Sequence, residues 1–155
     1  MQGKKIVIEQ LNALLAFELA AMDQYFIHSQ MYQDWGFNKL YERIAHEFDD
    51  EKGHATKLIE RMLFLEGIPN MVDRDGLMIG MDVPSMLESD LRVEYAVAQA
   101  LKETISICET EQDYVTRDIL LVLLDDTEMD HAHWLEQQLG LVKRLGLPNY
   151  LQSQM

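Results

Sequence analysis

Cysteine, proline and glycine are scarce in this chain of 155 residues, and each shortage excludes something. The single cysteine, Cys108, has no partner for an intrachain disulfide, which fits a reducing cytoplasm. Three prolines and eight glycines leave long stretches rich in Leu, Ala, Glu and Met, all good helix formers. No apolar run approaches the ~20 residues of a membrane span, and the first residues lack the apolar segment of a signal peptide. We therefore expect a cytoplasmic, all-α protein.

Basic residues are also few: 13 Lys and Arg face 27 Asp and Glu, for a net charge of −14. This balance argues against nucleic acid or an anionic membrane surface as a partner. It is compatible with the collection of cations and equally with plain solubility. Hydrophobic residues make up 48% of the chain, so we expect one globular domain over residues 1–155.

Breaks at glycine and proline predict four long helices and a short fifth one, over residues 5–35, 38–66, 84–112, 114–143 and 148–152. The first two helices, and likewise the next two, are joined by so few residues that each pair must form an antiparallel hairpin. The loop over 67–83 is unusually long. Extended, its ~17 residues reach about 56 Å, more than the ~42 Å length of a 28-residue helix. We expect a four-helix bundle with one long crossover loop and a short C-terminal fifth helix.

A doubled motif gives the strongest functional signal in the sequence. In each half of the chain a glutamate precedes a Glu-x-x-His, and the spacing between the two is longer by a single position in the second half. Helical periodicity places all of these polar residues on core-facing apolar stripes, near the middle of their helices. They are Glu18, Glu51 and His54 in the first half, and Glu94, Glu128 and His131 in the second.

Burying four carboxylates together would be prohibitively costly unless cations compensate their charge. Oxygen and imidazole donors without thiolate suit iron or manganese better than structural zinc. The i, i+3 spacing lets the Glu and His of one motif bind the same ion, which leaves Glu18 and Glu94 free to bridge two ions. Tyr25, two turns after Glu18, either contacts this site through its hydroxyl or is a plain core residue. The alternative to a metal centre is a set of buried, hydrogen-bonded polar groups.

Six further segments have a recognisable pattern, over residues 14–21, 23–28, 34–36, 59–67, 113–118 and 146–152. With the doubled motif, they make the chain resemble bacterioferritins and related bacterial ferritins over essentially its whole length. The resemblance implies a ferritin-like fold and a hollow homo-oligomeric shell of 24 subunits. It also implies a ferroxidase centre with two iron ions per subunit, which oxidises Fe(II) with O₂ or H₂O₂, and storage of the Fe(III) product as mineral. A ferredoxin-type protein is the implied reductant.

The resemblance also implies roles for individual residues. Glu51 and Glu128 would be the bridging carboxylates, and His54 and His131 the terminal imidazole ligands. His46 and Asp50 match a pair that binds iron on the inner wall of the shell. The alternative for this pair is a solvated acidic face shared with neighbouring carboxylates (Glu47 and Asp49). The fifth helix would line a four-fold channel, with Asn149 and Gln152 as its polar candidates.

One position departs from the bacterioferritin pattern. The family binds haem between two subunits through a methionine, and Lys52 occupies that position here. A charged ammonium has no lone pair for iron, so we expect no haem in a homo-oligomer. Met31 and Met86, which often lie near the haem in the family, are retained, so a remnant of the pocket stays open as an alternative. A mixed shell with a haem-binding paralogue also stays open.

Three other protein classes share parts of the pattern. A di-iron peroxidase or oxidoreductase of the rubrerythrin type usually carries Cys-x-x-Cys pairs, which one cysteine cannot supply. A subunit that only co-assembles with a haem-binding bacterioferritin would be favoured by a broken ligand set, whereas all six residues are present. Mini-ferritins of the Dps type share their metal site between subunits and lack the doubled pattern.

Reconstitution with haem tests the role of Lys52. We expect the purified chain to give no Soret band from bis-methionine ligation, because the lysine offers no sulfur ligand. Titration with haem, followed by absorbance, measures this directly. A stoichiometric band, at one haem for each pair of subunits, would contradict the expectation.

Overall fold

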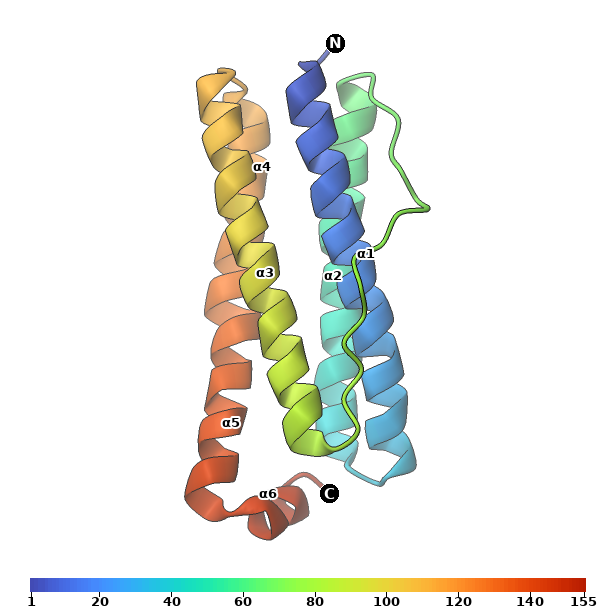
Figure 1. The fold of residues 1–155 in the computed structure, drawn as a ribbon, viewed down its shortest axis with the longest axis vertical. Coiled ribbons are helices and arrows are strands. Elements are labelled where there is room, and N and C mark those ends of the chain that lie inside the picture. Colours follow the sequence, from blue (N-terminus) through green and yellow to red (C-terminus); the bar gives the residue numbers. More distant parts are fainter.

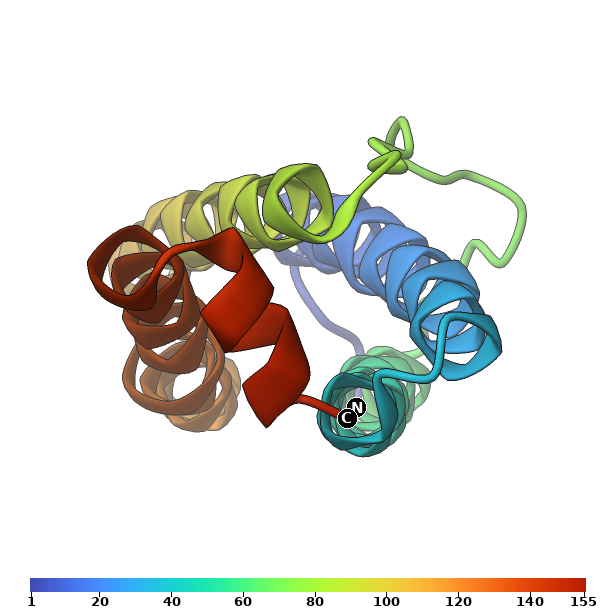
Figure 2. The ribbon, with the colours of Figure 1, turned by 90° about the horizontal axis from the view of Figure 1, so that it is seen from below.

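The computed structural model describes residues 1–155 and contains helices but no strands. Two antiparallel pairs of long rods form a bundle, and a short helix lies across one end (Figure 1, Figure 2). The fourth rod consists of three consecutive helical segments. In chain order the elements are α1 (Lys5–Asp34), α2 (Asn38–Phe64), α3 (Val83–Thr110), α4 (Tyr114–Asp125), η1 (Asp126–Ala132), α5 (His133–Leu145) and α6 (Leu147–Ser153). The predicted four-helix bundle with a short fifth helix is confirmed.

The long loop between α2 and α3 runs the length of the bundle alongside α1, as the single-crossover topology requires (Figure 1). Side chains of α1 hold it in place. The backbone N–H of Asn70 donates to Asn12 (2.8 Å), that of Met78 to Gln24 (3.0 Å) and that of Gly80 to His28 (3.1 Å). The loop therefore delivers α3 to the same end of the bundle as the start of α2.

Helix boundaries follow local capping chemistry. Asp82 starts α3 by accepting the backbone N–H of Ser85 (2.9 Å) in a capping box. At the end of α2 the backbone turns at Glu66, whose φ is 62°, so the helix stops at Phe64, slightly before the predicted end. Gly146 (φ 78°) separates α5 from α6. None of the helices combines the length and apolarity needed to cross a membrane.

Two apolar clusters fill the bundle, one toward each end. The first groups 14 buried residues around the N-terminal half of α1, including Leu11 and Leu15. The second groups 10 buried residues around the C-terminal half of α1, including Tyr25 and Tyr32. Glu51 on α2 and Glu94 on α3, both fully buried, lie between the residues that these helices contribute to the two clusters. The core is therefore two apolar regions separated by a polar layer.

The sequence predicts the fourth rod as one regular helix, but η1 is a π-helical turn in its middle. The two halves of the chain explain it. Glu18 lies as far from the end of α1 as Glu94 lies from the end of α3, and the two hairpin connections are equally long. Counted from the start of the following helix, however, Glu128 lies a single position further along its rod than Glu51 lies along α2. The extra residue of the second half thus lies inside the helix, and a wider π turn accommodates it.

Candidate metal centre

The polar layer brings together five of the six residues of the doubled motif. Glu18 comes from α1, Glu51 and His54 from α2, Glu94 from α3 and His131 from η1. All five are buried. The four residues on α1, α2 and α3 converge because each lies near the middle of a regular helix, on the face that packs against the other helices. The π turn η1 brings His131 to the same level.

Two groups of donor atoms share Glu51. In the first, Nδ1 of His54 lies 3.4 Å from Oε2 of Glu18 and 3.4 Å from Oε2 of Glu51. In the second, Nδ1 of His131 lies 2.9 Å from Oε1 of Glu51 and 3.3 Å from Oε1 of Glu94. Within each group the donor atoms lie within 4.8 Å of one another. The two imidazole rings stack with centroids 5.6 Å apart. This geometry suits two neighbouring cations with Glu51 between them.

The charges of this layer are strongly perturbed. Burial, reinforced by the negative charge of Glu51, raises the pKa of Glu18 well above its usual value, and burial likewise raises the pKa of Glu94. Burial works in the opposite direction on His54, but its contacts with Glu18 and Glu51 raise the pKa of His54 to about 11. The carboxylate oxygens of Glu18 and Glu51 accept no hydrogen bond. Buried oxygens in this condition are costly unless a cation binds them.

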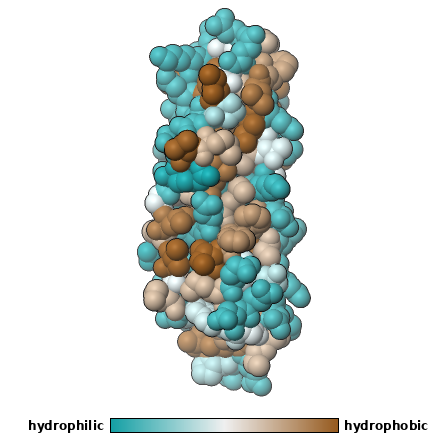
Figure 3. All heavy atoms as spheres, turned by 90° about the vertical axis from the view of Figure 1, so that its right-hand side faces the viewer, coloured by the Kyte–Doolittle hydropathy of each residue, from teal (hydrophilic) through white to brown (hydrophobic).

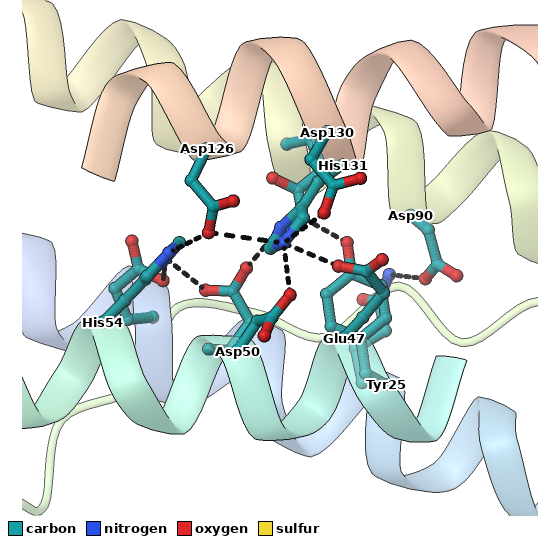
Figure 4. A network of polar contacts seen from close by, with 12 residues as sticks. Tyr25, Glu47, Asp50, His54, Asp90, Asp126, Asp130 and His131 are labelled. Carbon is teal, nitrogen blue, oxygen red and sulfur yellow. Dashed lines mark hydrogen bonds and ion pairs between the residues drawn. The ribbon is translucent and has the colours of Figure 1, made fainter. Parts of the chain in front are cut away.

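Each imidazole has a further carboxylate behind it, on the side away from its Nδ1 (Figure 4). Nε2 of His54 donates to Oδ2 of Asp126 at 2.6 Å. Nε2 of His131 lies 2.6 Å from Oε2 of Glu47. A carboxylate that receives the second ring nitrogen of a histidine fixes the ring so that the first nitrogen faces the metal. Asp126 and Glu47 therefore belong to the site, although the doubled motif does not contain them.

Glu47 and Asp126 escaped the sequence analysis for different reasons. The sequence suggests Glu47 only as part of a solvated acidic face, yet it is 2% exposed. Its position one turn before Glu51 was the available signal, because residues four apart share a helix face. Asp126 gave no such signal, because a regular helix does not place it on the same face as His131. The π turn does, since it brings residues five apart into register.

The expectation that Glu128 lies on the core face is wrong. Its side chain is 42% exposed, and its Oε1 lies 2.8 Å from Nζ of Lys102 on α3. The π turn is the cause. A π-helix has more residues per turn than an α-helix, so residues three apart no longer share a face. When His131 faces the core, Glu128 therefore points away from it. Thr127 and His131 face inward and are buried, whereas Glu128 points outward.

The remaining candidate residues lie as follows. The Tyr25 hydroxyl donates to Oε1 of Glu94, so it contacts the site directly. His46 is 60% exposed, and its Nε2 lies 3.4 Å from Oδ2 of Asp50. Lys52 is exposed on α2. Of the two retained methionines, Met86 is fully buried and Met31 is partly buried against the same apolar cluster. Asn149 and Gln152 are exposed on α6.

Known proteins resemble this chain over nearly its whole length. A family model described as a ferritin-like domain matches residues 8–145. A protein of Synechocystis sp. named bacterial ferritin is 59% identical over the whole chain and 99% of its own length. A bacterial ferritin of Pseudomonas aeruginosa is 58% identical, with both chains fully covered. A bacterioferritin of Brucella melitensis is 40% identical over 97% of this chain and 92% of its own.

Metal binding should release protons. Because the pKa of His54 is raised to about 11, its imidazole is protonated at neutral pH in the metal-free protein. A cation must displace that proton, so affinity should increase with pH. We expect the release of at least one proton per bound ion, measured by anaerobic calorimetry with Co(II) in buffers of different ionisation enthalpy. Heats that do not depend on the buffer would contradict the described charge state.

Proposed function

This chain belongs to the ferritin family, and on that premise we propose that it is an iron-storage protein with ferroxidase activity. Each subunit would oxidise Fe(II) at an internal two-iron centre and pass the Fe(III) on for storage. One observation carries the proposal: buried Glu51 has one oxygen in each of two donor groups, and each group adds a second carboxylate and an imidazole. Hard oxygen donors with imidazole suit iron.

We propose that Glu18, Glu51 and His54 bind one ion, and that Glu51, Glu94 and His131 bind the other. Glu51 would be one bridging carboxylate, as the family resemblance implies. The resemblance implies the same role for Glu128, which in this structure pairs with Lys102 outside the donor groups. Each Fe(II) would give up one electron. The pair of electrons, with two protons, reduces O₂ to H₂O₂ or H₂O₂ to two water molecules. The protons displaced from the imidazoles on metal entry would supply a local proton source for this reduction.

Other residues of the site hold the ligands in place. The Tyr25 hydroxyl orients the Glu94 carboxylate, while Asp126 and Glu47 orient the rings of His54 and His131. Fixing ligands before the metal arrives lowers the reorganisation needed for electron transfer and binding. The two apolar clusters limit access of water to the layer from the ends of the bundle.

Asp50 lies where iron could pass from the centre to the surface of the subunit. Its Oδ2 lies 3.2 Å from Nε2 of buried His131 and 3.4 Å from Nε2 of exposed His46. Asp50 therefore touches both the centre and the surface. We propose that His46 and Asp50 receive iron on the inner wall of the shell.

We propose further that the protein works as a shell of 24 copies in the cytoplasm, without haem in the homomeric form and with a ferredoxin-type reductant for iron release. The surface supports assembly. Large hydrophobic side chains are exposed, including Phe26, Phe64, Ile68 and Val72. On the side of the bundle that carries the crossover loop, apolar areas alternate with polar ones (Figure 3). Such exposed apolar area is typical of surfaces that pack against other subunits.

A di-iron oxidoreductase acting on an organic molecule is the second candidate, and the cavities argue against it. A surface cavity of about 540 Å³ between α2 and α4 is lined by Lys57, Arg61, Phe64 and Val122, among others, and by none of the proposed ligands. An organic substrate needs a cavity that reaches the reactive ions. Iron ions and small oxidants do not.

Substitution of the bridging carboxylate tests the centre. We expect Glu51→Ala to slow Fe(II) oxidation on the order of 100-fold or more, since it removes an oxygen from both ions. Stopped-flow absorbance measures the rate, and size-exclusion chromatography checks assembly. Glu109→Gln is the matched control, because Glu109 pairs with Arg117 on the surface, outside the donor groups. An unchanged rate in the assembled Glu51→Ala protein would defeat the assignment.

Iron loading separates storage from plain catalysis. We expect the pure chain to form a particle of roughly 24 subunits that takes up far more iron than its two-iron centres hold. The mass comes from size exclusion with light scattering, and the iron content from chemical analysis after aerobic loading. Saturation at two iron ions per chain would favour a di-iron oxidoreductase instead.

A further inference from the structure

A second set of carboxylates lies just beyond the metal centre, on the far side of His131 (Figure 4). We call Glu47, Asp50, Asp126 and Asp130 the outer carboxylates. Their nearest oxygens lie 2.6, 3.2, 3.7 and 3.9 Å, respectively, from Nε2 of His131. Two come from α2 and two from η1, so the set spans the gap between these elements.

His131 cannot neutralise these four groups. Its Nε2–H can donate to one oxygen at a time, and its other nitrogen faces Glu51 and Glu94. Glu47 is 2% exposed, and neither of its oxygens accepts a hydrogen bond of regular geometry. A buried carboxylate in this condition requires a cation close by.

Arg43 supplies that cation. Its Nε lies 2.5 Å from Oε1 of Glu47, and its Nη2 donates to Oδ1 of Asp130 at 2.8 Å. Its guanidinium carbon lies 4.9 Å from the ring centroid of Trp134. The guanidinium is thus fixed by two carboxylates and one aromatic face. Because arginine stays charged in proteins, this compensation is permanent.

We propose that Arg43, as a resident organic cation, compensates the charge that a third metal ion would otherwise compensate, and that it thereby restricts the centre to two ions. This inference rests on the proposed two-iron centre and deepens it. Oxygens of Glu47, Asp50 and Asp130 lie, together with a nitrogen of His131, within 4.8 Å of one another. That spacing suits one ion with oxygen ligands. Arg43 contacts Oε1 of Glu47 and Oδ1 of Asp130, whereas Oε2 of Glu47 and Oδ2 of Asp130 face His131. Without the guanidinium these carboxylates would lack their cation, and a metal ion should bind between them instead.

The inference also explains why arginine suits this position better than lysine. The planar guanidinium can bond to carboxylates on two different elements while it stacks on an indole. An ammonium is a compact, strongly hydrated point charge. It would reproduce neither the planar contacts with two carboxylates nor the stacking on the indole. Arg43 therefore ties α2 to η1 beside the centre, as well as balancing charge.

Crystals soaked in Mn(II) test the proposal through anomalous scattering, without any activity measurement. In the wild-type protein we expect two peaks at the centre and none between Glu47, Asp50 and Asp130. In Arg43→Gln we expect a third peak, between Glu47, Asp50 and Asp130. Arg43→Met is a second variant, since its side chain keeps a contact with Trp134 if the glutamine variant folds poorly. Lys102→Gln is the matched control, because it removes a different cation–carboxylate pair of the same rod, and it should show no third peak.

The double variant Arg43→Gln/Glu47→Gln should lose the third peak. The proposal is overturned if neither Arg43 variant shows a peak between Glu47, Asp50 and Asp130, or if the wild-type protein binds an ion there with Arg43 in place. Absence of the two central peaks in every protein would count against the two-metal centre itself. A third peak that is confined to the Arg43 variants would still support the role of Arg43 in that case.

Discussion

Three carboxylates, those of Glu18, Glu51 and Glu94, lie fully buried beside two imidazoles, and the rest of the structure is arranged around the cost of their charge. Apolar clusters on either side keep water away, which strengthens every electrostatic interaction in the layer. Without a metal, protons on the histidines compensate the charge. In the proposed metal-bound state, two cations would do so. The polar layer therefore requires positive charge, carried either by protons or by metal ions.

The residues around this layer also compensate one another's charge. Behind the imidazoles lie Asp126 and Glu47, which orient the rings but add negative charge. Arg43 then balances Glu47 and Asp130. Negative and positive groups thus alternate from the centre toward the surface. In metal sites generally, such outer partners fix the orientation of the residues that bind the metal. The π turn serves this arrangement, because it presents Asp126 and His131 to the same side.

Much of the fold followed from local chemistry. Glycine and proline mark the helix boundaries, and apolar periodicity marks the buried faces. The length of the loop between α2 and α3 was enough to infer the crossover. Four of the six candidate ligands meet because each lies on the core face near the middle of a regular helix. The other two lie in the π turn, which directs His131 inward as expected but turns Glu128 outward.

The sequence by itself determined the helices, their order, the crossover and the doubled motif, because these depend on the propensities and spacing of residues close together in the chain. The sequence also showed that the second half of the motif contains one extra residue, but it did not show where the helix accommodates that residue. Only the tertiary structure decided that the π turn absorbs this residue next to His131. That choice turns Glu128 toward Lys102 and Asp126 toward His54. The physical reason is that the direction of a side chain depends on the accumulated rotation of its helix, and the energy of packing against other helices decides where that rotation changes.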